Sequence, residues 1–354
     1  TRRALKAGRV LQNQMSDKKG GHQKCILCDP DENRPQNTSR NEVIIPGRVS
    51  GFRNDYPYLP EDQLVLYMWH DDLRVRQSAF HRYRLRDFGE LELFWLVHAA
   101  IERGRRFNTP AFTGDIWRMV VGFNLGTLAG QSLPHFHLQY GWEVALEPRV
   151  IKKEALALYF KELEDEQLII YSDARVRLVA PWTPKGQYAT ELYFVNKCEF
   201  RQLDRTDIQY FAVFGAEIIR RYMAIGIQNL NIVFTNSPVE RETEPLVAHF
   251  VPRVNMAALY EIRGVNVVDT PPRNIAVEFT KVNSHREDNR RLWPDVARDA
   301  QQFDPNKLYE DRVAAHDSGP RLPVRPTPGV TPESALAAAP TTAPPTRKSR
   351  SPSA

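Results

Sequence analysis

Two histidines and a glutamine alternate along one short segment in the first half of the chain, at His135, His137 and Gln139. A turn of small and polar residues precedes them, with Asn124, Gly126, Gly130, Gln131 and Ser132. Residues at alternate positions of a strand share one face, so the two imidazoles and the amide should point the same way. A nucleophilic imidazole beside a turn rich in hydrogen-bond donors suits nucleotide transfer through a covalent histidine intermediate.

The run from Gly130 to Gln139, Gly-Gln-Ser-Leu-Pro-His-Phe-His-Leu-Gln, resembles the signature of the histidine-triad superfamily. Within it, the run is similar to the branch of galactose-1-phosphate uridylyltransferase and of the dinucleoside-polyphosphate and GDP-hexose phosphorylases. Small histidine-triad hydrolases carry a third histidine where this chain has Gln139, whereas the transferase and phosphorylase branch carries glutamine. The resemblance therefore implies a nucleotidyltransferase and disfavours a hydrolase.

The same resemblance implies a role for each residue of the segment. His137 would attack the α-phosphorus of a donor nucleotide, and an acceptor phosphate would then take the nucleotide from the histidine. Gln139 would hold a non-bridging phosphate oxygen. The remaining cradle would consist of Asn124, Gly126, Gly130, Gln131 and Ser132, with the glycines permitting close approach of the backbone.

Cys25 and Cys28 have the spacing of a metal-binding pair, and their thiolates would suit Zn²⁺. A tetrahedral site needs two more ligands, for which the sequence offers His70, His81, His135 and His249. The resemblance implies a structural zinc bound by Cys25, Cys28, His81 and His135, with His70 as the alternative to His81. Four protein ligands leave no open position, so this zinc would support the catalytic strand and take no part in the reaction. Two reduced cysteines without a metal are the other interpretation.

The nucleoside pocket is expected around Asn54 and Asp55, in the run Phe52-Arg-Asn-Asp-Tyr-Pro. This run is similar to the strand from which superfamily members bind the ribose. The Asp55 carboxylate would accept hydrogen bonds from the 2′ and 3′ hydroxyls, and Asn54 would lie beside the base or the ribose. A simple turn is the alternative, because Asn-Asp before an aromatic residue and proline is common turn chemistry.

Hydrophobic periodicity predicts one order of elements twice. Strand 62–69, helix 86–103 and strand 117–123 precede the histidine strand, and strand 190–196, helix 206–225 and strand 231–235 precede a strand around His249. We therefore expect an α+β fold of two tandem duplicated histidine-triad-like units, with antiparallel sheets and helices packed on them. The family's second metal site uses two histidines of the second unit. Here Val247 stands two positions before His249, so that site is expected to be absent or incomplete.

The predicted domain boundaries divide the chain of 354 residues into four parts. A flexible basic segment at 1–22 precedes the catalytic unit at 23–150, and a degenerate second unit at 151–312 precedes a disordered tail at 313–354 that is rich in proline and alanine. The formal net charge is +5, and the positive charge is concentrated in the two terminal segments. Such a distribution is poor support for nucleic-acid binding.

The remaining sequence features favour a cytoplasmic enzyme. No apolar run is long enough to span a bilayer, the first residues carry no apolar signal region, and three cysteines do not make a disulfide framework. We expect a nucleotide or nucleotide-sugar substrate and a phosphate-bearing acceptor, without nucleic-acid or membrane partners, and the resemblance favours a homodimer. The leading reaction exchanges a sugar 1-phosphate against a nucleotide sugar. The alternatives are a dinucleoside-polyphosphate or GDP-hexose phosphorylase and, behind these, a hydrolase or a nucleotide-binding protein without turnover.

Overall fold

The computed structural model describes twelve parts of the chain: 27, 42–53, 59, 61–69, 85, 88–106, 116–131, 135–145, 151–238, 244–253, 270–280 and 291–317. Nearly all of them belong to one unit that extends from Thr1 to His316. Six of the predicted site residues lie outside the described residues, namely Cys25, Cys28, Asn54, Asp55, His81 and Ser132. None of the helices among the described residues is long and apolar enough to cross a membrane.

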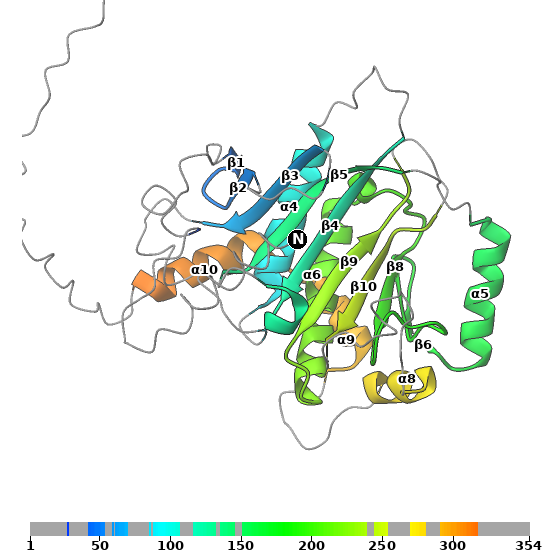
Figure 1. Ribbon diagram of the computed structural model, residues 1–354. Helices are drawn as coiled ribbons and strands as arrows, with labels where there is room; N and C mark the ends of the chain where they lie inside the picture. The colour runs from blue at the N-terminus through cyan, green and yellow to red at the C-terminus, as the bar shows by residue number, and fades with distance from the viewer. Residues whose placement is uncertain are drawn as a thin grey trace, which may run out of the picture. The chain divides into compact units, whose positions relative to one another are not determined.

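Ten strands of the described residues form one sheet, in the order β1-β2-β3-β5-β4-β9-β10-β8-β7-β6 (Figure 1). The first five are β1 (Glu42–Ile45), β2 (Val49–Arg53), β3 (Glu61–Met68), β4 (Trp117–Leu125) and β5 (His137–Val144). The other five are β6 (Ile169–Ser172), β7 (Val176–Val179), β8 (Thr190–Phe194), β9 (Leu230–Thr235) and β10 (Val247–Pro252). Every neighbouring pair is antiparallel, which confirms the predicted α+β class with an antiparallel sheet.

The two sides of the sheet repeat one order of elements. From edge to centre, one side reads β1, β2, β3, β5, β4 and the other reads β6, β7, β8, β10, β9. A long helix follows the third strand of each side in the sequence: α4 (Glu90–Arg105) after β3, and α6 (Arg205–Ala224) after β8. We call β1 to β5 with α4 the first half, and β6 to β10 with α6 the second half. The halves meet where β4 pairs with β9, with Asn124 opposite Asn231.

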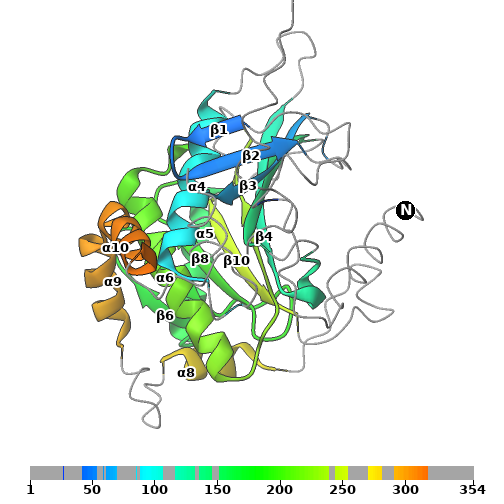
Figure 2. The same ribbon diagram turned by 90° about the vertical axis from the view of Figure 1, so that its left-hand side faces the viewer.

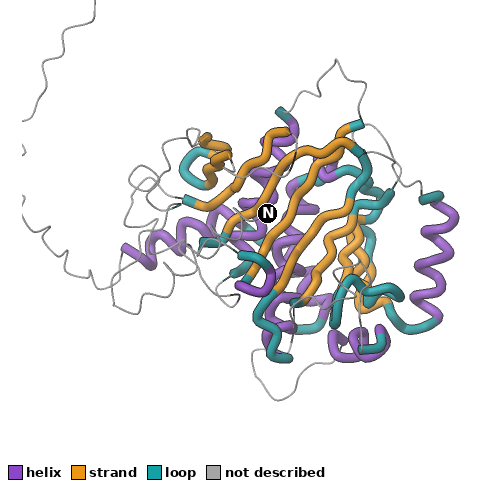
Figure 3. The backbone as a smooth tube through the Cα atoms, viewed as in Figure 1, coloured by secondary structure: helices purple, strands orange, loops and turns teal. Residues whose placement is uncertain are grey.

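Helices α4 and α6 pack side by side on one face of the sheet, and α9 (Trp293–Gln302) packs against α6 (Figures 2 and 3). Alternate strand residues supply the apolar surface beneath them, including Phe123 of β4 and Leu138 and Tyr140 of β5, all fully buried. Strand alternation therefore leaves the intervening residues on the opposite face, which we call the open face. The other described helices are α5 (Lys153–Asp165), α8 (Pro272–Thr280) and α10 (Pro305–Asp317), with 3₁₀ turns η2 (Thr127–Ala129) and η3 (Phe200–Gln202).

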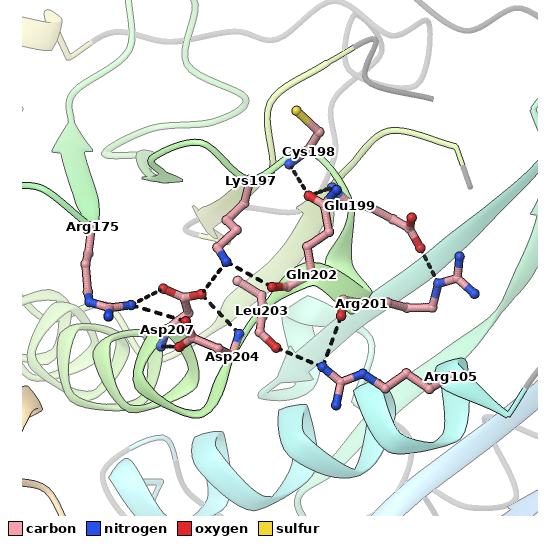
Figure 4. A network of polar contacts seen from close by, with 10 residues as sticks. All are labelled: Arg105, Arg175, Lys197, Cys198, Glu199, Arg201, Gln202, Leu203, Asp204 and Asp207. Atoms are coloured by element: carbon pink, nitrogen blue, oxygen red, sulfur yellow. Dashed lines mark hydrogen bonds and ion pairs between the residues drawn. The ribbon is translucent and has the colours of Figure 1, made fainter. Parts of the chain in front are cut away.

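Polar contacts at the start of α6 tie it to both halves (Figure 4). Asp204 caps the helix by accepting from Asp207 N at 2.8 Å, and the Asp207 carboxylate accepts from Asp204 N at 3.1 Å. The buried Asp207 carboxylate also pairs with Arg175 at 2.9 Å and Lys197 at 3.1 Å. Arg105 of α4 reaches across to the carbonyl oxygens of Arg201 and Leu203. A buried carboxylate needs such partners, so this cluster fixes where α6 begins.

The C-terminal helix α10 packs back on the first half. Tyr309 donates to the carbonyl oxygen of Gly47 at 2.7 Å, and the Arg48 guanidinium lies 3.5 Å from the centre of the Tyr309 ring. Arg312 forms an ion pair with the buried Glu92 carboxylate at the start of α4. Helix α10 extends to Asp317, past residue 313, where the sequence predicts the start of the tail.

Candidate active site

The predicted nucleophile His137 is the first residue of β5 and lies on the open face. Its register partner on β3 is Tyr67, and Gln139 lies opposite Gly122 of β4 and Val65 of β3. His137 is buried, whereas Gln139 is half-buried. His135 lies in the bend before β5 and not in the strand as the alternation predicts, yet its side chain is fully buried. Because β5 begins at His137, the alternation of His135, His137 and Gln139 in the sequence starts two residues before the strand does.

A backbone contact determines the tautomer of the His137 ring. Its Nδ1 lies 2.8 Å from the carbonyl oxygen of His135. A carbonyl oxygen only accepts hydrogen bonds, so Nδ1 must carry the proton in this contact. In the neutral ring the lone pair then resides on Nε2, which is the atom able to act as a nucleophile. The backbone contact thus selects the tautomer in which Nε2 carries the lone pair.

The turn between β4 and β5 is closed by its own residues. Gly126 N donates to Gln131 Oε1 at 2.7 Å, and Gln131 N donates back to the Gly126 carbonyl oxygen at 3.2 Å. Gly126 and Gly130 both adopt left-handed backbone conformations, with φ of 93° and 84°. The carbonyl end of the Gln131 amide, which the sequence predicts in the phosphate cradle, therefore stabilises the turn. We call residues 126–131 the phosphate turn, after the phosphate cradle that the sequence predicts there.

The second half also binds this turn, a feature that the sequence does not predict. Asn229 Oδ1 accepts from Leu128 N at 3.1 Å. Asn231 of β9 donates through Nδ2 to the Ala129 carbonyl oxygen at 2.9 Å and to Asn124 Oδ1 at 2.7 Å. The candidate site therefore belongs to both halves, although His137 and Gln139 come from the first.

Replacing Gly126 with alanine tests how tightly this turn is packed. The new Cβ would overlap Asn229 Oδ1 and lie 2.9 Å from the Gln228 carbonyl oxygen, in a left-handed conformation. We expect the free energy of unfolding to fall by about 2–4 kcal/mol, measured by chemical denaturation. Gly130→Ala is the matched control, since Gly130 has a similar φ but nothing lies within 4 Å of the methyl group that alanine would add. That variant should lose only about 1 kcal/mol, and equal losses in both variants would contradict the packing argument.

The surroundings of His135 bear on the predicted zinc site. The His135 ring meets Tyr67 edge to face, with centroids 5.9 Å apart. Tyr67 packs in turn on Leu27, which is buried and lies between Cys25 and Cys28 in the sequence. The described residues contain no group of three or more metal-ligand side chains, and three of the four predicted ligands lie outside these residues. Among the described residues, Leu27 is therefore linked to His135 through Tyr67.

His249 of β10 lies on the open face in a buried polar cluster. Its Nδ1 is 2.9 Å from Glu191 Oε1 and its Nε2 is 2.8 Å from Thr235 Oγ1, while Tyr193 donates to Glu191 Oε2 at 2.7 Å. Burial alone would raise the pKa of Glu191. The hydrogen bonds from His249 and Tyr193 outweigh it, so the pKa of this carboxyl lies below its usual value. His249 thus serves as a partner for a buried carboxylate.

Comparisons with known proteins show the fold. No protein-family model matches the chain, and no curated protein matches its sequence. An ADP-glucose phosphorylase from Arabidopsis thaliana with bound ADP-glucose has a similar structure, with a TM-score of 0.53 and 17% identity over 67% of this chain and 82% of that one. A uridylyltransferase has a TM-score of 0.51 and 16% sequence identity, and the match covers 70% of this chain and 91% of that one. A GalT-like protein from Arabidopsis thaliana has a TM-score of 0.52 and 16% sequence identity, and the match covers 66% of this chain and 83% of that one. The predicted resemblance is therefore confirmed at the level of the fold.

Proposed function

We propose that this protein transfers a nucleoside monophosphate between phosphate-bearing substrates through a covalent intermediate on His137. The observation that carries the proposal is the 2.8 Å contact from His137 Nδ1 to the His135 carbonyl oxygen, which leaves Nε2 as the nucleophile beside the phosphate turn. The fold shared with a uridylyltransferase and an ADP-glucose phosphorylase supports the same reaction class.

The reaction would proceed in two displacements. Nε2 of His137 attacks the α-phosphorus of the donor, the phosphorus–oxygen bond to the leaving phosphate breaks, and a phosphorus–nitrogen bond forms. The charge that develops on the ring is stabilised through Nδ1–H by the His135 carbonyl oxygen. A phosphate oxygen of the acceptor then attacks the same phosphorus, and the bond to His137 breaks. Gln139 and the free end of the Asn124 amide would donate to the non-bridging oxygens.

The favoured donor is a nucleotide sugar and the favoured acceptor is a sugar 1-phosphate. Phosphorolysis of a nucleotide sugar or a dinucleoside polyphosphate is the second candidate, because the similar structures include a phosphorylase with bound ADP-glucose. Both reactions share the first displacement and differ only in the acceptor. A hydrolase remains disfavoured, because Gln139 stands where the hydrolytic branch carries a third histidine.

We further infer that the two halves arose by tandem duplication. The mirrored strand order and the equivalent places of α4 and α6 support this inference. In the second half, His249 occupies the strand equivalent to that of His137 but is bonded to Glu191 and Thr235. The second half would therefore have lost the catalytic role and retained a structural one.

The proposed function is tested by the mass of the intact protein after incubation with UDP-, GDP- and ADP-sugars and with dinucleoside polyphosphates. We expect a mass increase equal to one nucleoside monophosphate with one class of donor, which also identifies the base. Adding sugar 1-phosphates or inorganic phosphate should then remove the adduct, and the effective acceptor separates transferase from phosphorylase. No adduct with any donor would contradict the proposed reaction.

A structural zinc is proposed at Cys25, Cys28, His135 and His81, with His70 as the alternative fourth ligand. The buried His135 and the contact from Tyr67 to Leu27 support it. Two thiolates and two imidazoles make a closed tetrahedral set, so the zinc would hold the cysteine segment against the start of β5.

The Cys25→Ser variant should lose this zinc. Metal analysis should show about one zinc per chain in the wild type and almost none in the variant, together with a lower melting temperature. Cys198→Ser is the matched control, because Cys198 precedes η3 in the second half and belongs to no predicted ligand set. Equal zinc content in Cys25→Ser and the wild type would exclude the site.

A further inference from the structure

We propose that Asn231 and Arg253, both from the second half, are positioning residues for the phosphate turn and act through Asn124. The proposal rests on the proposed function in one respect, that the anion at this turn is the phosphate of a nucleotide. It assigns the second half an active part in a site whose predicted residues all belong to the first half.

The side-chain amide of Asn231 has a defined orientation because both of its ends are bonded. Nδ2 donates to Asn124 Oδ1 at 2.7 Å and to the Ala129 carbonyl oxygen at 2.9 Å. Oδ1 accepts from Arg253 Nε at 2.6 Å. A reversed amide would direct its oxygen at two acceptors and its nitrogen at a donor, so the hydrogen-bond partners assign one orientation. Asn231 is also buried, and it lies opposite Asn124 in the pairing of β4 with β9.

The orientation of Asn231 determines which end of Asn124 faces a ligand. Asn124 Oδ1 is bonded to Asn231, so the amide nitrogen of Asn124 is the end left to meet an anion. Phe123 is paired with Leu138, which places Asn124 at the register position beside His137. A donor, and not a repelling oxygen, would therefore be presented next to the nucleophile. This arrangement is what a site for phosphate oxygens requires.

Arg253 completes the chain of contacts from the end of β10. Its backbone N–H donates to the Asn229 carbonyl oxygen at 2.9 Å, which holds the residue beside the asparagine that bonds Leu128 N. Its guanidinium bonds Asn231, and Arg253 as a residue is exposed, so a positive charge lies at the edge of the phosphate turn. Arg253 would thus stabilise the Asn231 amide and attract the anion.

The test combines two measurements on the full chain. The first is the affinity for inorganic pyrophosphate by calorimetry, which requires no turnover. The second is the rate of adduct formation with the donor found by mass spectrometry. Asn231→Leu keeps the size and adds no charge, and we expect both quantities to fall roughly ten- to hundredfold. Arg253→Met should lower them by about three- to tenfold, and Arg253→Lys should restore most of that loss.

A double variant shows whether Asn231 acts through Asn124. If it does, Asn124→Ala with Asn231→Leu should bind pyrophosphate no more weakly than Asn124→Ala alone. Asn236→Leu is the control for loss of stability, since Asn236 is also a buried asparagine of the second half and donates to the Ser237 carbonyl oxygen. This control should lower the melting temperature without changing pyrophosphate affinity.

The outcomes separate the two proposals. If the wild type forms no adduct but Asn231→Leu loses pyrophosphate affinity, the positioning role stands and the proposed transfer fails. Wild-type affinity and rate in Asn231→Leu would overturn the positioning role alone. Three other results would overturn it too. The Asn124 and Asn231 substitutions could lower pyrophosphate affinity independently of each other, or Asn236→Leu could lower it as much as Asn231→Leu does. The third result is a wild type that binds no pyrophosphate.

Discussion

The His137→Gly variant should form no nucleotide adduct and should lose at least about 10⁴-fold in turnover. The described strand β5 carries no second histidine that could replace His137, and removing a covalent nucleophile leaves only the contribution of binding. Donor affinity should remain within about tenfold of the wild type, because Gln131, Asn229 and Asn231 hold the phosphate turn in place. We therefore expect a variant that binds the donor nucleotide but does not form the adduct.

Intact-mass spectrometry and calorimetry on the same preparation measure the two effects separately. His98→Gln is the matched control, since His98 lies on α4, contacts Phe94 and Trp95, and belongs to the helix side of the sheet. That variant should form the adduct at the wild-type rate. Adduct formation by His137→Gly would mean that a different residue is the nucleophile, and the tautomer argument would then be wrong.

The sequence predicts those parts of the site that depend on strand alternation and helical spacing between neighbouring residues. Strand alternation separates Leu138 and Tyr140, which are buried beneath the helices, from His137 and Gln139 on the open face. Apolar spacing likewise predicts α4 and α6 to within a few residues. These features depend on neighbours a few positions apart, so a single sequence contains them.

The contribution of the second half could not be predicted in this way. Asn124 and Asn231 are 107 residues apart, and they meet only because β4 pairs with β9 at one register. A shift of one residue would move Asn231 to the helix side and remove its three side-chain hydrogen bonds, to Asn124, Ala129 and Arg253. Asparagine near a strand end is common turn chemistry, so neither Asn229 nor Asn231 carries a signal of its own. Register between distant strands is a tertiary property.

Replacing Glu191 with glutamine should lower the free energy of unfolding by about 3 kcal/mol at neutral pH. The carboxylate is buried and accepts from His249 Nδ1 and from the Tyr193 hydroxyl. Glutamine has one acceptor oxygen, so its amide nitrogen would face one of these donors and leave a buried group unsatisfied. Nucleotide transfer should change little, because His249 is separated from Gln139 by three strand spacings, about 14 Å.

The acid limb of the stability curve distinguishes this explanation from a simple packing defect. The pKa of Glu191 is lowered in the folded protein from the ordinary value of 4.5. The folded state therefore binds fewer protons than the unfolded chain in that range, and the stability from Glu191 is full above pH 4.5 and lost as the pH falls through the lowered pKa. Urea denaturation between about pH 6 and pH 3 should show a shallower loss of unfolding free energy for Glu191→Gln than for the wild type.

Glu162→Gln, on the exposed side of α5, is the control, and its unfolding free energy should follow the wild-type curve within about 0.5 kcal/mol. Parallel acid limbs for Glu191→Gln and the wild type would show that the buried carboxylate is not ionised.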